Sequence, residues 1–363
     1  MKTMTLRKRQ ENTSIIQALL QAQRIAFAPF VFQATLAAKR LGILRAFSES
    51  DKPLTFEECA QKCGLTPYAV QVVCELLANV DVLSGSAQDG FAITKTGECL
   101  LYDPMTSVNL DFTADVCYKG LAHLDTALKE GRPAGLAELG PWETIYPALS
   151  SLPEPAKSSW FGFDHFYSDV AFAACAKWLS VNLKPATLFD VGGNTGKFAG
   201  VCLNVMPKLE VVIVDLPQQC TLAKANESLN AVRSRLDTAP VNWLDLSAKP
   251  ATDKKADVIW MSQFLDCFNE DEAVSILTRL KPYLAQNGRF AVLECLWDRQ
   301  KHEAASLSLL STSLYFTAMA NGNSRFFSEV ELRRIFERSG LEVESASDRL
   351  GVSHTLFVCR IKD

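Results

Sequence analysis

The sequence predicts an α/β protein of two domains, a mostly helical one followed by one with a doubly wound parallel sheet. Three observations predict this. Apolar residues recur at helical spacing through the first 80 residues, apolar runs of strand length alternate with helical segments from residue 186 onward, and 363 residues suffice for two cores. The segment 150–158 carries two prolines among small polar residues. We therefore expect domains at residues 1–150 and 159–363, joined by this linker.

The first domain is expected to begin with a helix over residues 15–44, closed by Gly42. Thr55 and Glu58 have the spacing of a capping box at the start of a second helix. A turn at residues 64–67 leads into a third helix, and residues 80–83 and 91–94 predict a small hairpin. This order of elements is typical of a winged helix.

Winged helices often bind DNA, but the segment 67–79 contains no Lys or Arg. A recognition helix needs such side chains for phosphates and guanine edges. The formal net charge of −4 also argues against a nucleic-acid surface. We therefore expect no nucleic-acid partner and a helix that packs against protein.

The amino-acid composition indicates the cellular location of the protein and the state of its cysteines. No run of 18 apolar residues is present and residues 1–10 lack the apolar region of a secretory signal, so we expect a cytoplasmic protein with no membrane partner. Eleven cysteines without paired spacing are typical of reduced thiols. With no Cys-x-x-Cys pair and four scattered histidines, no metal is expected.

The second domain is expected to alternate strands and helices, with the last two strands antiparallel. Ligands of such sheets bind at the carboxyl ends of the strands. The expected strands cover residues 186–191, 209–215, 241–246, 256–261, 288–295, 341–346 and 353–360.

The first of these strands runs directly into a glycine-rich turn, Asp190-Val-Gly-Gly-Asn-Thr-Gly196. A dinucleotide fingerprint would require glycines at positions 194 and 197, where this chain has Asn194 and Lys197. Asp190 suits an ammonium group better than a pyrophosphate, and Asp215, which ends the next strand, suits the two hydroxyls of a ribose. The pattern predicts a ligand with an amino-acid tail and a ribose but no phosphate, S-adenosylmethionine.

The glycine turn together with Val214-Asp-Leu-Pro217 resembles the small-molecule O-methyltransferase family, which includes caffeate-type and acetylserotonin-type enzymes and many bacterial enzymes of secondary metabolism. The resemblance implies a Rossmann-like, seven-stranded methyltransferase domain, S-adenosylmethionine as cofactor, and a homodimer formed through an N-terminal winged-helix dimerisation domain. It also implies a set of cofactor-binding residues, namely Asp190, Gly192, Gly193, Gly196, Asp215, Leu216, Asp245, Leu246, Ser262 and Gln263.

The chain departs from the family at the catalytic base. The family's segment Leu-His-Asp-Trp-x-Asp-Glu aligns with residues 265–271, which places Asp266 where the histidine belongs. Of the two carboxylates that steer that histidine, Glu294 matches the first, and Ser324 stands at the second. Ser262 also replaces a lysine that contacts the cofactor.

Three interpretations remain open. Asp266 acts as the base, if burial or the neighbouring Glu294 raises its pKa. Alternatively, the acceptor needs little help, as an acidic phenol, a carboxylate or an aromatic carbon ortho to a phenol would. In the third interpretation methyl transfer has been lost, and the protein is a cofactor-binding partner subunit or catalyses another reaction.

A replacement base is also conceivable in the aromatic segment 160–169, where His165 follows Asp164. The competing interpretation is an aromatic helix with a solvent-facing histidine. We expect a methyltransferase that acts on a small aromatic or polyketide-type metabolite, on oxygen or on ring carbon, with Asp266, His165 and Glu294 as the candidate catalytic residues.

Overall fold

The computed structural model describes residues 14–348 and 350–362, so the segment in which no secretory signal was expected lies outside the described residues. The described chain divides into two compact units between Ala114 and Asp115. This division precedes the expected linker, because residues 115–152 belong with the later part of the chain. For example, Ile145 N–H donates to the carbonyl of Ala320 at 2.9 Å. We call residues 14–114 the helical unit and residues 115–362 the sheet unit.

The helical unit begins with two helices where the sequence predicted one. The break falls at Phe27, and Pro29, which has no N–H to donate, lies in the first turn of the second helix. Gly42, with φ +78°, precedes the third. The helices are α1 (Ile15–Ala26), α2 (Ala28–Arg40), α3 (Ile43–Ser48), α4 (Phe56–Cys63), α5 (Pro67–Asn79), α6 (Lys95–Tyr102) and α7 (Pro104–Phe112).

The capping box and the hairpin are confirmed. Glu58 N–H donates to Thr55 Oγ1 at 3.2 Å, and Thr55 N–H donates to Glu58 Oε2 at 2.9 Å. The hairpin pairs β1 (Leu83–Ser86) with β2 (Gly90–Ile93). A separate core lies between the helices and the hairpin, so this unit has its own apolar interior.

The sheet unit begins with short helical segments followed by one long helix. That helix, α9, takes in the whole aromatic segment 160–169. The elements are η1 (Thr113–Cys117), which crosses the division, η2 (Gly120–His123), α8 (Leu124–Glu130), η3 (Ala134–Glu138), η4 (Tyr146–Ser151) and α9 (Ala156–Asn182).

The seven-stranded sheet has the order β5-β4-β3-β6-β7-β9-β8. The first five strands in this order run parallel, and β9 pairs antiparallel with β7 and β8. The strands are β3 (Thr187–Val191), β4 (Glu210–Asp215), β5 (Leu236–Pro240), β6 (Ala256–Ser262), β7 (Leu284–Cys295), β8 (Leu341–Ser347) and β9 (His354–Ile361).

The prediction of the third strand at residues 241–246 was wrong. The strand is β5, and residues 241–246 follow it as turns. Asp215 pairs with Pro240, and Val241 N–H donates to the carbonyl of Asp215 at 2.8 Å, after which the chain leaves the sheet. The side chain of Asn242 then accepts from Leu244 N–H and starts the turns.

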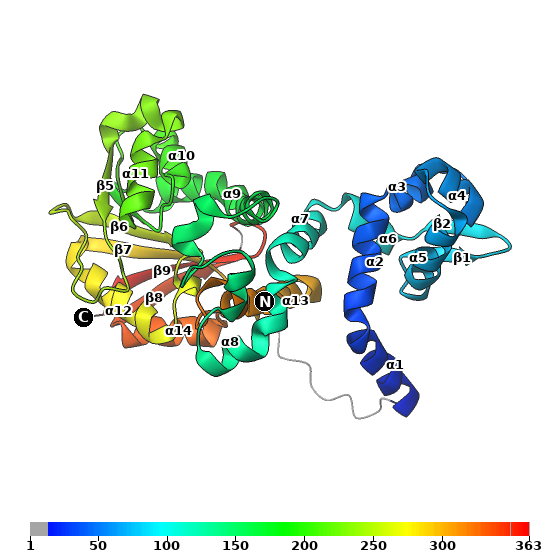
Figure 1. Ribbon diagram of the computed structural model, residues 1–363. Helices are drawn as coiled ribbons and strands as arrows, with labels where there is room; N and C mark the ends of the chain where they lie inside the picture. Colours follow the sequence, from blue (N-terminus) through cyan, green and yellow to red (C-terminus); the bar gives the residue numbers. More distant parts are fainter. Residues whose placement is uncertain (1–13, 349, 363) are drawn as a thin grey trace. The chain divides into compact units, whose positions relative to one another are not determined.

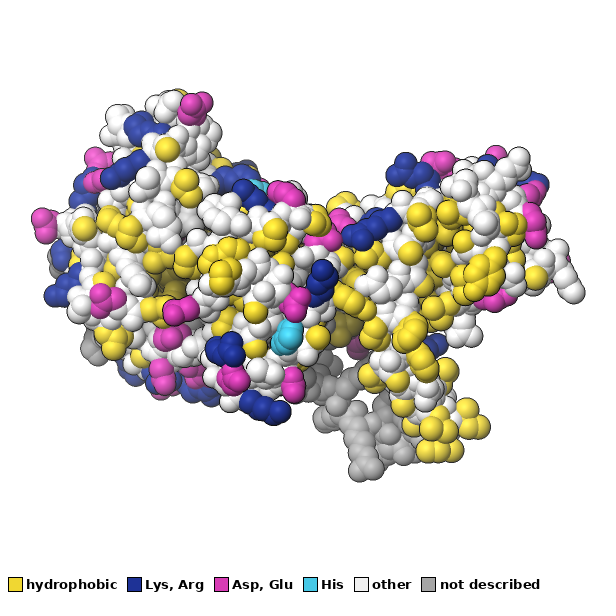
Figure 2. All heavy atoms as spheres, viewed as in Figure 1, with side chains coloured by type: hydrophobic (Ala, Val, Ile, Leu, Met, Phe, Trp, Pro, Cys, Tyr) yellow, Lys and Arg dark blue, Asp and Glu magenta, His cyan; other side chains and the backbone are white. Residues whose placement is uncertain are grey.

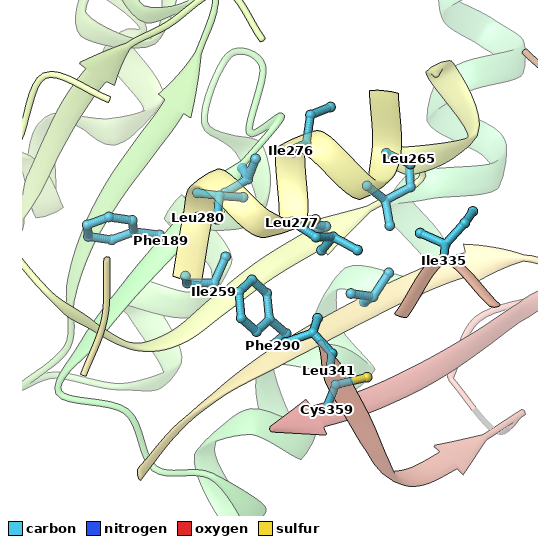
Figure 3. Close-up of a cluster of buried hydrophobic side chains, with 14 of the residues drawn as sticks. Phe189, Ile259, Leu265, Ile276, Leu277, Leu280, Phe290, Ile335, Leu341 and Cys359 are labelled. Carbon is cyan, nitrogen blue, oxygen red and sulfur yellow. The ribbon is translucent and has the colours of Figure 1, made fainter. Parts of the chain in front are cut away.

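Helices cover both faces of this sheet (Figure 1). On one face α12 and α14 pack against Phe189, Ile259 and Phe290 (Figure 3). On the other face α9 and α10 pack against Leu188 and Trp260. The helical segments that follow α9 are α10 (Lys197–Val205), α11 (Pro217–Ala225), η5 (Glu227–Arg235), η6 (Leu265–Cys267), α12 (Glu270–Leu280), η7 (Lys281–Tyr283), α13 (Glu303–Tyr315), η8 (Phe316–Ala320) and α14 (Glu329–Arg338).

The strand order reverses direction at β3. From β3 the chain passes outward to β4 and β5, then returns to β6 on the other side of β3. The carboxyl ends of β3 and β6 therefore flank the switch point of the sheet, which is where ligands of open α/β sheets bind.

Among the described residues, the helix lengths and hydropathies leave no single helix able to cross a membrane. The pair α1 and α2 reaches the required length and hydropathy together, with a bend of 58° between its members.

The core between the sheet and α12 provides a test of this unit's packing. Leu277 is fully buried there, so Leu277→Ala should lower the free energy of unfolding by about 2–5 kcal/mol through lost contacts and a cavity. All six tryptophans lie at residue 142 or later, so tryptophan fluorescence during urea unfolding follows the sheet unit alone. Val330→Ala on the exposed face of α14 is the control and should change this free energy by at most about 0.5 kcal/mol. Equal effects would contradict the assigned core.

Candidate active site

The glycine turn lies at the carboxyl end of β3, against the loop that follows β6. Gly192 has φ +74°, and a Cβ there would stand 2.4 Å from the ring of Phe264. Only glycine fits this position without moving one of the two loops. The turn ends at Gly196, which begins α10 in a left-handed conformation, so the N-terminus of that helix faces the turn.

Asp190 is buried beneath the turn, and its Oδ2 has no hydrogen-bond partner among the described residues. Burial, helped by the negative charge of Asp215, raises the pKa of Asp190 to about 7. A Cβ on Gly193 would lie 2.7 Å from this Oδ2, so the absence of a side chain keeps the carboxyl accessible from the turn. A cation placed there would satisfy the oxygen and lower the pKa again.

Asp215 ends β4 on the other side of the same turn. Its Oδ2 accepts from Asn194 N–H at 2.8 Å, and its Oδ1 accepts from Leu216 N–H at 2.6 Å. Each oxygen can accept a second hydrogen bond. The carboxylate is therefore fixed in orientation and still able to receive a pair of vicinal hydroxyls.

The remaining residues implied for the cofactor fall into two groups. Ser262 and Gln263 follow β6 beside the turn, and Ser262 Oγ is buried without a partner among the described residues. Asp245 and Leu246 lie instead on an exposed turn, where Asp245 Oδ1 accepts from the backbone and hydroxyl of Ser247. The structure therefore brings Ser262 and Gln263 to the glycine turn. The carboxylate of Asp245, in contrast, forms its hydrogen bonds within its own turn.

These residues fit S-adenosylmethionine. The orphaned oxygen of Asp190 can accept from the ammonium group, the oriented carboxylate of Asp215 can accept from the ribose hydroxyls, and the bare backbone at Gly192 and Gly193 allows close approach.

The candidate base lies on η6, the short segment that follows Phe264. Asp266 is 3% exposed, and burial raises the pKa of its carboxyl to about 7, with the charge of Asp164 adding to the effect. Cys267 Sγ lies 3.6 Å from Asp266 Oδ1. A carboxyl in this condition can take up a proton near neutral pH.

Glu294 is the penultimate residue of β7 and lies beside η6. Its Oε1 accepts from Phe264 N–H at 3.1 Å and Leu265 N–H at 2.8 Å, while its Oε2 is buried without a partner among the described residues. Burial and the charge of Asp266 raise the pKa of Glu294 well above its usual range. The structure thus brings the two candidate carboxyls, Asp266 and Glu294, into one site.

His165 does not join them. Its ring is on the exposed side of α9, 5.8 Å from the ring of Phe161. The preceding residue, Asp164, is the one whose charge acts on Asp266. Trp160, one turn earlier on α9, donates from Nε1 to the hydroxyl of Tyr315 at 2.7 Å.

Ser324, at the position of the family's second carboxylate, is linked to η6 through Asn321. Ser324 Oγ donates to Asn321 Oδ1 at 2.9 Å, and Asn321 Nδ2 donates to the carbonyl of Cys267 at 2.7 Å. This amide steers the backbone of the base segment rather than the side chain of the base.

The sequence did not indicate two residues of this site. Asp164 follows Trp160 by four residues and His165 follows Phe161 by four, so spacing alone did not distinguish the two. Tyr146 begins η4, a short 3-10 helix, and its buried hydroxyl lies beside Cys267. No local pattern indicates that its side chain is buried near the site.

Comparison with known proteins identifies the two domains. Residues 176–342 match the model of the O-methyltransferase domain, and residues 19–84 match that of a Dimerisation2-like domain. The chain is 23% identical to a 3-amino-4-hydroxybenzoate 4-O-methyltransferase of Streptomyces cremeus, over 87% of this chain and 83% of the relative. It is 26% identical to a mitomycin biosynthesis 6-O-methyltransferase of Streptomyces lavendulae, over 86% of each.

A solved structure shows the same fold. Human N-acetylserotonin methyltransferase, crystallised with S-adenosylmethionine, superposes with a TM-score of 0.64 at 18% identity, over 97% of this chain and 99% of that one. Fold and site together define an S-adenosylmethionine-dependent methyltransferase. Within that class, residues 176–342 form an O-methyltransferase domain, as in the family that the sequence resembled.

The bare backbone at Gly193 can be tested directly. Gly193→Ala should weaken S-adenosylmethionine binding at least about tenfold, because the new Cβ displaces Asp190 from the ammonium position. Isothermal titration calorimetry measures this affinity. Gly162→Ala on α9 is the matched control, since a Cβ there meets nothing within 4 Å and should leave the affinity unchanged. An unchanged affinity of Gly193→Ala would contradict the cofactor position.

Proposed function

We propose that this enzyme methylates a hydroxyl group of a small aromatic metabolite, with Asp266 as the proton acceptor in place of the family's histidine. The observation that carries the proposal is the buried carboxyl of Asp266, held beside Glu294 with a pKa of about 7. An efficient general base has a pKa near the working pH, and an ordinary exposed aspartate, with a pKa near ~4, falls well below it.

Glu294 complements this role as the protonated member of the pair. Because its Oε1 accepts two backbone N–H groups, its proton belongs on Oε2. A neutral carboxyl can donate a hydrogen bond from that oxygen, while Asp266 accepts one. The pair therefore offers both a donor and an acceptor in one site.

The other residues of the site bind and orient the cofactor. Bound S-adenosylmethionine supplies a methyl group on a sulfonium centre. Asp190 would hold the ammonium group of that cofactor and Asp215 its ribose hydroxyls, from adjacent strands. Alignment of nucleophile, methyl and leaving sulfur in a dry site accounts for much of the rate that such an enzyme gains.

The relatives support an aromatic acceptor methylated on oxygen. One is named for the 4-hydroxyl of an aminohydroxybenzoate, and another for an oxygen in mitomycin biosynthesis. The presence of a base-competent carboxyl pair supports removal of a proton from the acceptor, and it disfavours a protein that has lost methyl transfer.

The pH dependence of kcat tests the role of Asp266 as base. Asp266→Asn should lower kcat by about 10²–10⁴-fold while leaving S-adenosylmethionine affinity unchanged. In the wild type, kcat should rise with pH through about 7 as Asp266 loses its proton. Asp164 and Cys267 act on the pKa of Asp266, whose charge in turn acts on Glu294 and Tyr146.

Asp164→Asn refines this test. It removes a negative charge that raises the pKa of Asp266, so the midpoint of the kcat profile should move to lower pH. His165→Gln is the neighbouring control and should leave both the rate and the midpoint unchanged, because its ring is exposed. A large loss in His165→Gln with an unaffected Asp266→Asn would assign the base to the histidine.

We further propose that the protein is a cytoplasmic homodimer held together by the helical unit, which we take to be its winged-helix dimerisation domain. The described part of α1 buries none of its residues, and its apolar side chains lie exposed on the surface (Figure 2). A contiguous apolar surface of this kind marks a protein interface. The match of residues 19–84 to a Dimerisation2-like domain supports the same conclusion.

The oligomeric state of variants tests whether the helical unit forms the dimer interface. The double variant Leu19→Glu, Leu20→Glu should convert a dimer into a monomer in analytical ultracentrifugation, because two charges would be buried in the interface. Gln21→Glu with Gln23→Glu adds the same charge to exposed polar positions of α1 and should leave the dimer intact. A monomeric wild type at micromolar concentration would overturn the homodimer.

A further inference from the structure

Lys197 is a charged residue at the glycine turn that has no role in the binding or methyl transfer described above. It begins α10 directly after Gly196, the last glycine of the turn. A positive charge in the first turn of a helix is unfavourable with the helix dipole, and this first turn contains no acidic residue to offset it. Lys197 therefore needs an anion from another part of the structure or from a ligand.

Asp169 of α9 supplies one such anion. Lys197 Nζ donates to Asp169 Oδ2, which joins the start of α10 to α9. The lysine side chain is half exposed, and an ion pair of that exposure contributes little to stability. An ammonium group has three N–H donors, and this bond uses one of them. Lys197 can therefore bind a second anion while it stays paired with Asp169.

The buried carboxyl of Asp190 lies against the same turn of α10. A Cβ on Gly193 would lie 2.7 Å from Asp190 Oδ2, the oxygen that has no hydrogen-bond partner among the described residues. Burial and the charge of Asp215 raise the pKa of Asp190, and a hydrogen bond from the backbone of Ala199, in the first turn of α10, opposes that rise. The position suited to an ammonium group and the N-terminus of α10 are therefore neighbouring parts of one site.

The methionine portion of S-adenosylmethionine carries its carboxylate on the same carbon atom as its ammonium group. A ligand whose ammonium group meets Asp190 therefore brings a negative charge into a site that already contains the carboxyls of Asp190, Asp215 and Asp266. Like charges repel strongly in surroundings of low dielectric constant. This carboxylate thus requires a cation of the protein beside the turn.

The chain offers few cations for this role. Between residues 158 and 207, which include most of α9, β3, the turn and α10, the sequence has two other lysines. Lys177 lies toward the end of α9 and Lys184 precedes β3, so both are toward the amino edge of the sheet. Lys197 alone in this described stretch lies at the carboxyl edge. The first N–H groups of α10, which have no partner within the helix, add to the attraction for an anion.

We propose that Lys197 binds the α-carboxylate of S-adenosylmethionine, while Asp169 holds the lysine in position and Asp190 binds the ammonium group of the same ligand. Each charge of the methionine portion then meets an opposite charge of the protein at the N-terminus of α10. Lys197 is thus a specificity residue for a cofactor that retains its carboxylate. This inference rests on the ammonium position at Asp190.

The experiment compares two ligands that differ only in this carboxylate, S-adenosylhomocysteine and its decarboxylated analogue, 5′-(3-aminopropylthio)-5′-deoxyadenosine. Isothermal titration calorimetry measures the affinity of each for the wild type and for Lys197→Met, which keeps an unbranched side chain without the charge. Lys197→Met should weaken S-adenosylhomocysteine binding about tenfold and leave the analogue unchanged, because only the first ligand loses a charge-assisted hydrogen bond.

Three further variants are the controls. Lys177→Met removes an exposed lysine from α9 and should change neither affinity. Lys197→Arg keeps the positive charge and should retain the preference for S-adenosylhomocysteine. Asp169→Asn removes the ion pair but keeps an oxygen that accepts from Lys197, so it should retain the preference as well. A melting temperature for each variant identifies a loss of folding, and if Lys197→Met does not fold, Lys197→Gln takes its place with the same expected result.

Equal weakening of both ligands in Lys197→Met and in Asp169→Asn would overturn the proposal, because Lys197 would then act on the fold through its ion pair. Unchanged binding of both ligands in Lys197→Met would overturn it too, as would a wild type that binds the two ligands equally or binds neither.

Failure of this proposal is distinguishable from failure of the ammonium position. If Gly193→Ala weakens both ligands and Lys197→Met does not discriminate between them, Asp190 keeps its role and Lys197 loses the one proposed here. If Gly193→Ala leaves both affinities unchanged, the ammonium position itself is wrong, whatever the effect of Lys197→Met.

Discussion

The parallel pairing of β3 with both β4 and β6 is the constraint on which the site depends. Since parallel neighbours end at the same edge, this pairing places Asp190, Asp215 and the segment 262–266 along one line, and β7 adds Glu294 to it. The contact between Gly192 and the ring of Phe264 then joins the cofactor turn to the acceptor segment. Phe264 is in turn tied to Glu294 through its N–H, so both halves of the site share one backbone framework.

The same arrangement removes these carboxyls from water, and burial is the first cause of each raised pKa at the site. Asp190, Asp266 and Glu294 are nearly fully buried, and each keeps at least one oxygen that could accept from, or donate to, a ligand. The stability of the unit comes instead from the apolar layers on the two faces of the sheet. The fold thus separates the interactions that hold it together from those that serve chemistry.

Much of this could be predicted from the sequence, because the strong signals are local. The glycine turn, Asp215, the capping box and most strands follow from short patterns of apolar, glycine and acidic residues. The third strand was misplaced because Leu236-Asp-Thr-Ala-Pro240 carries little apolar signal, whereas Val241-Asn-Trp-Leu resembles a strand and forms turns. The aromatic segment offered both His165 and Asp164, and because adjacent residues on a helix face different ways, the sequence alone did not determine which of them lies toward the sheet. Tyr146 reaches the site only through tertiary contacts, which no local pattern records.

With Asp266 as the proposed base, the charge balance of the reaction would differ from that with a histidine. A histidine base begins neutral and ends as a cation, so the positive charge of the sulfonium persists in the site as imidazolium. A carboxylate begins as an anion and ends neutral, so opposite charges that are present at the start vanish together. In a medium of low dielectric constant, a process that annihilates charge is favoured over one that merely relocates it. The dry surroundings that make Asp266 costly to ionise would thus also favour the transfer, so a carboxylate base has a stronger reason to exclude water than a histidine base.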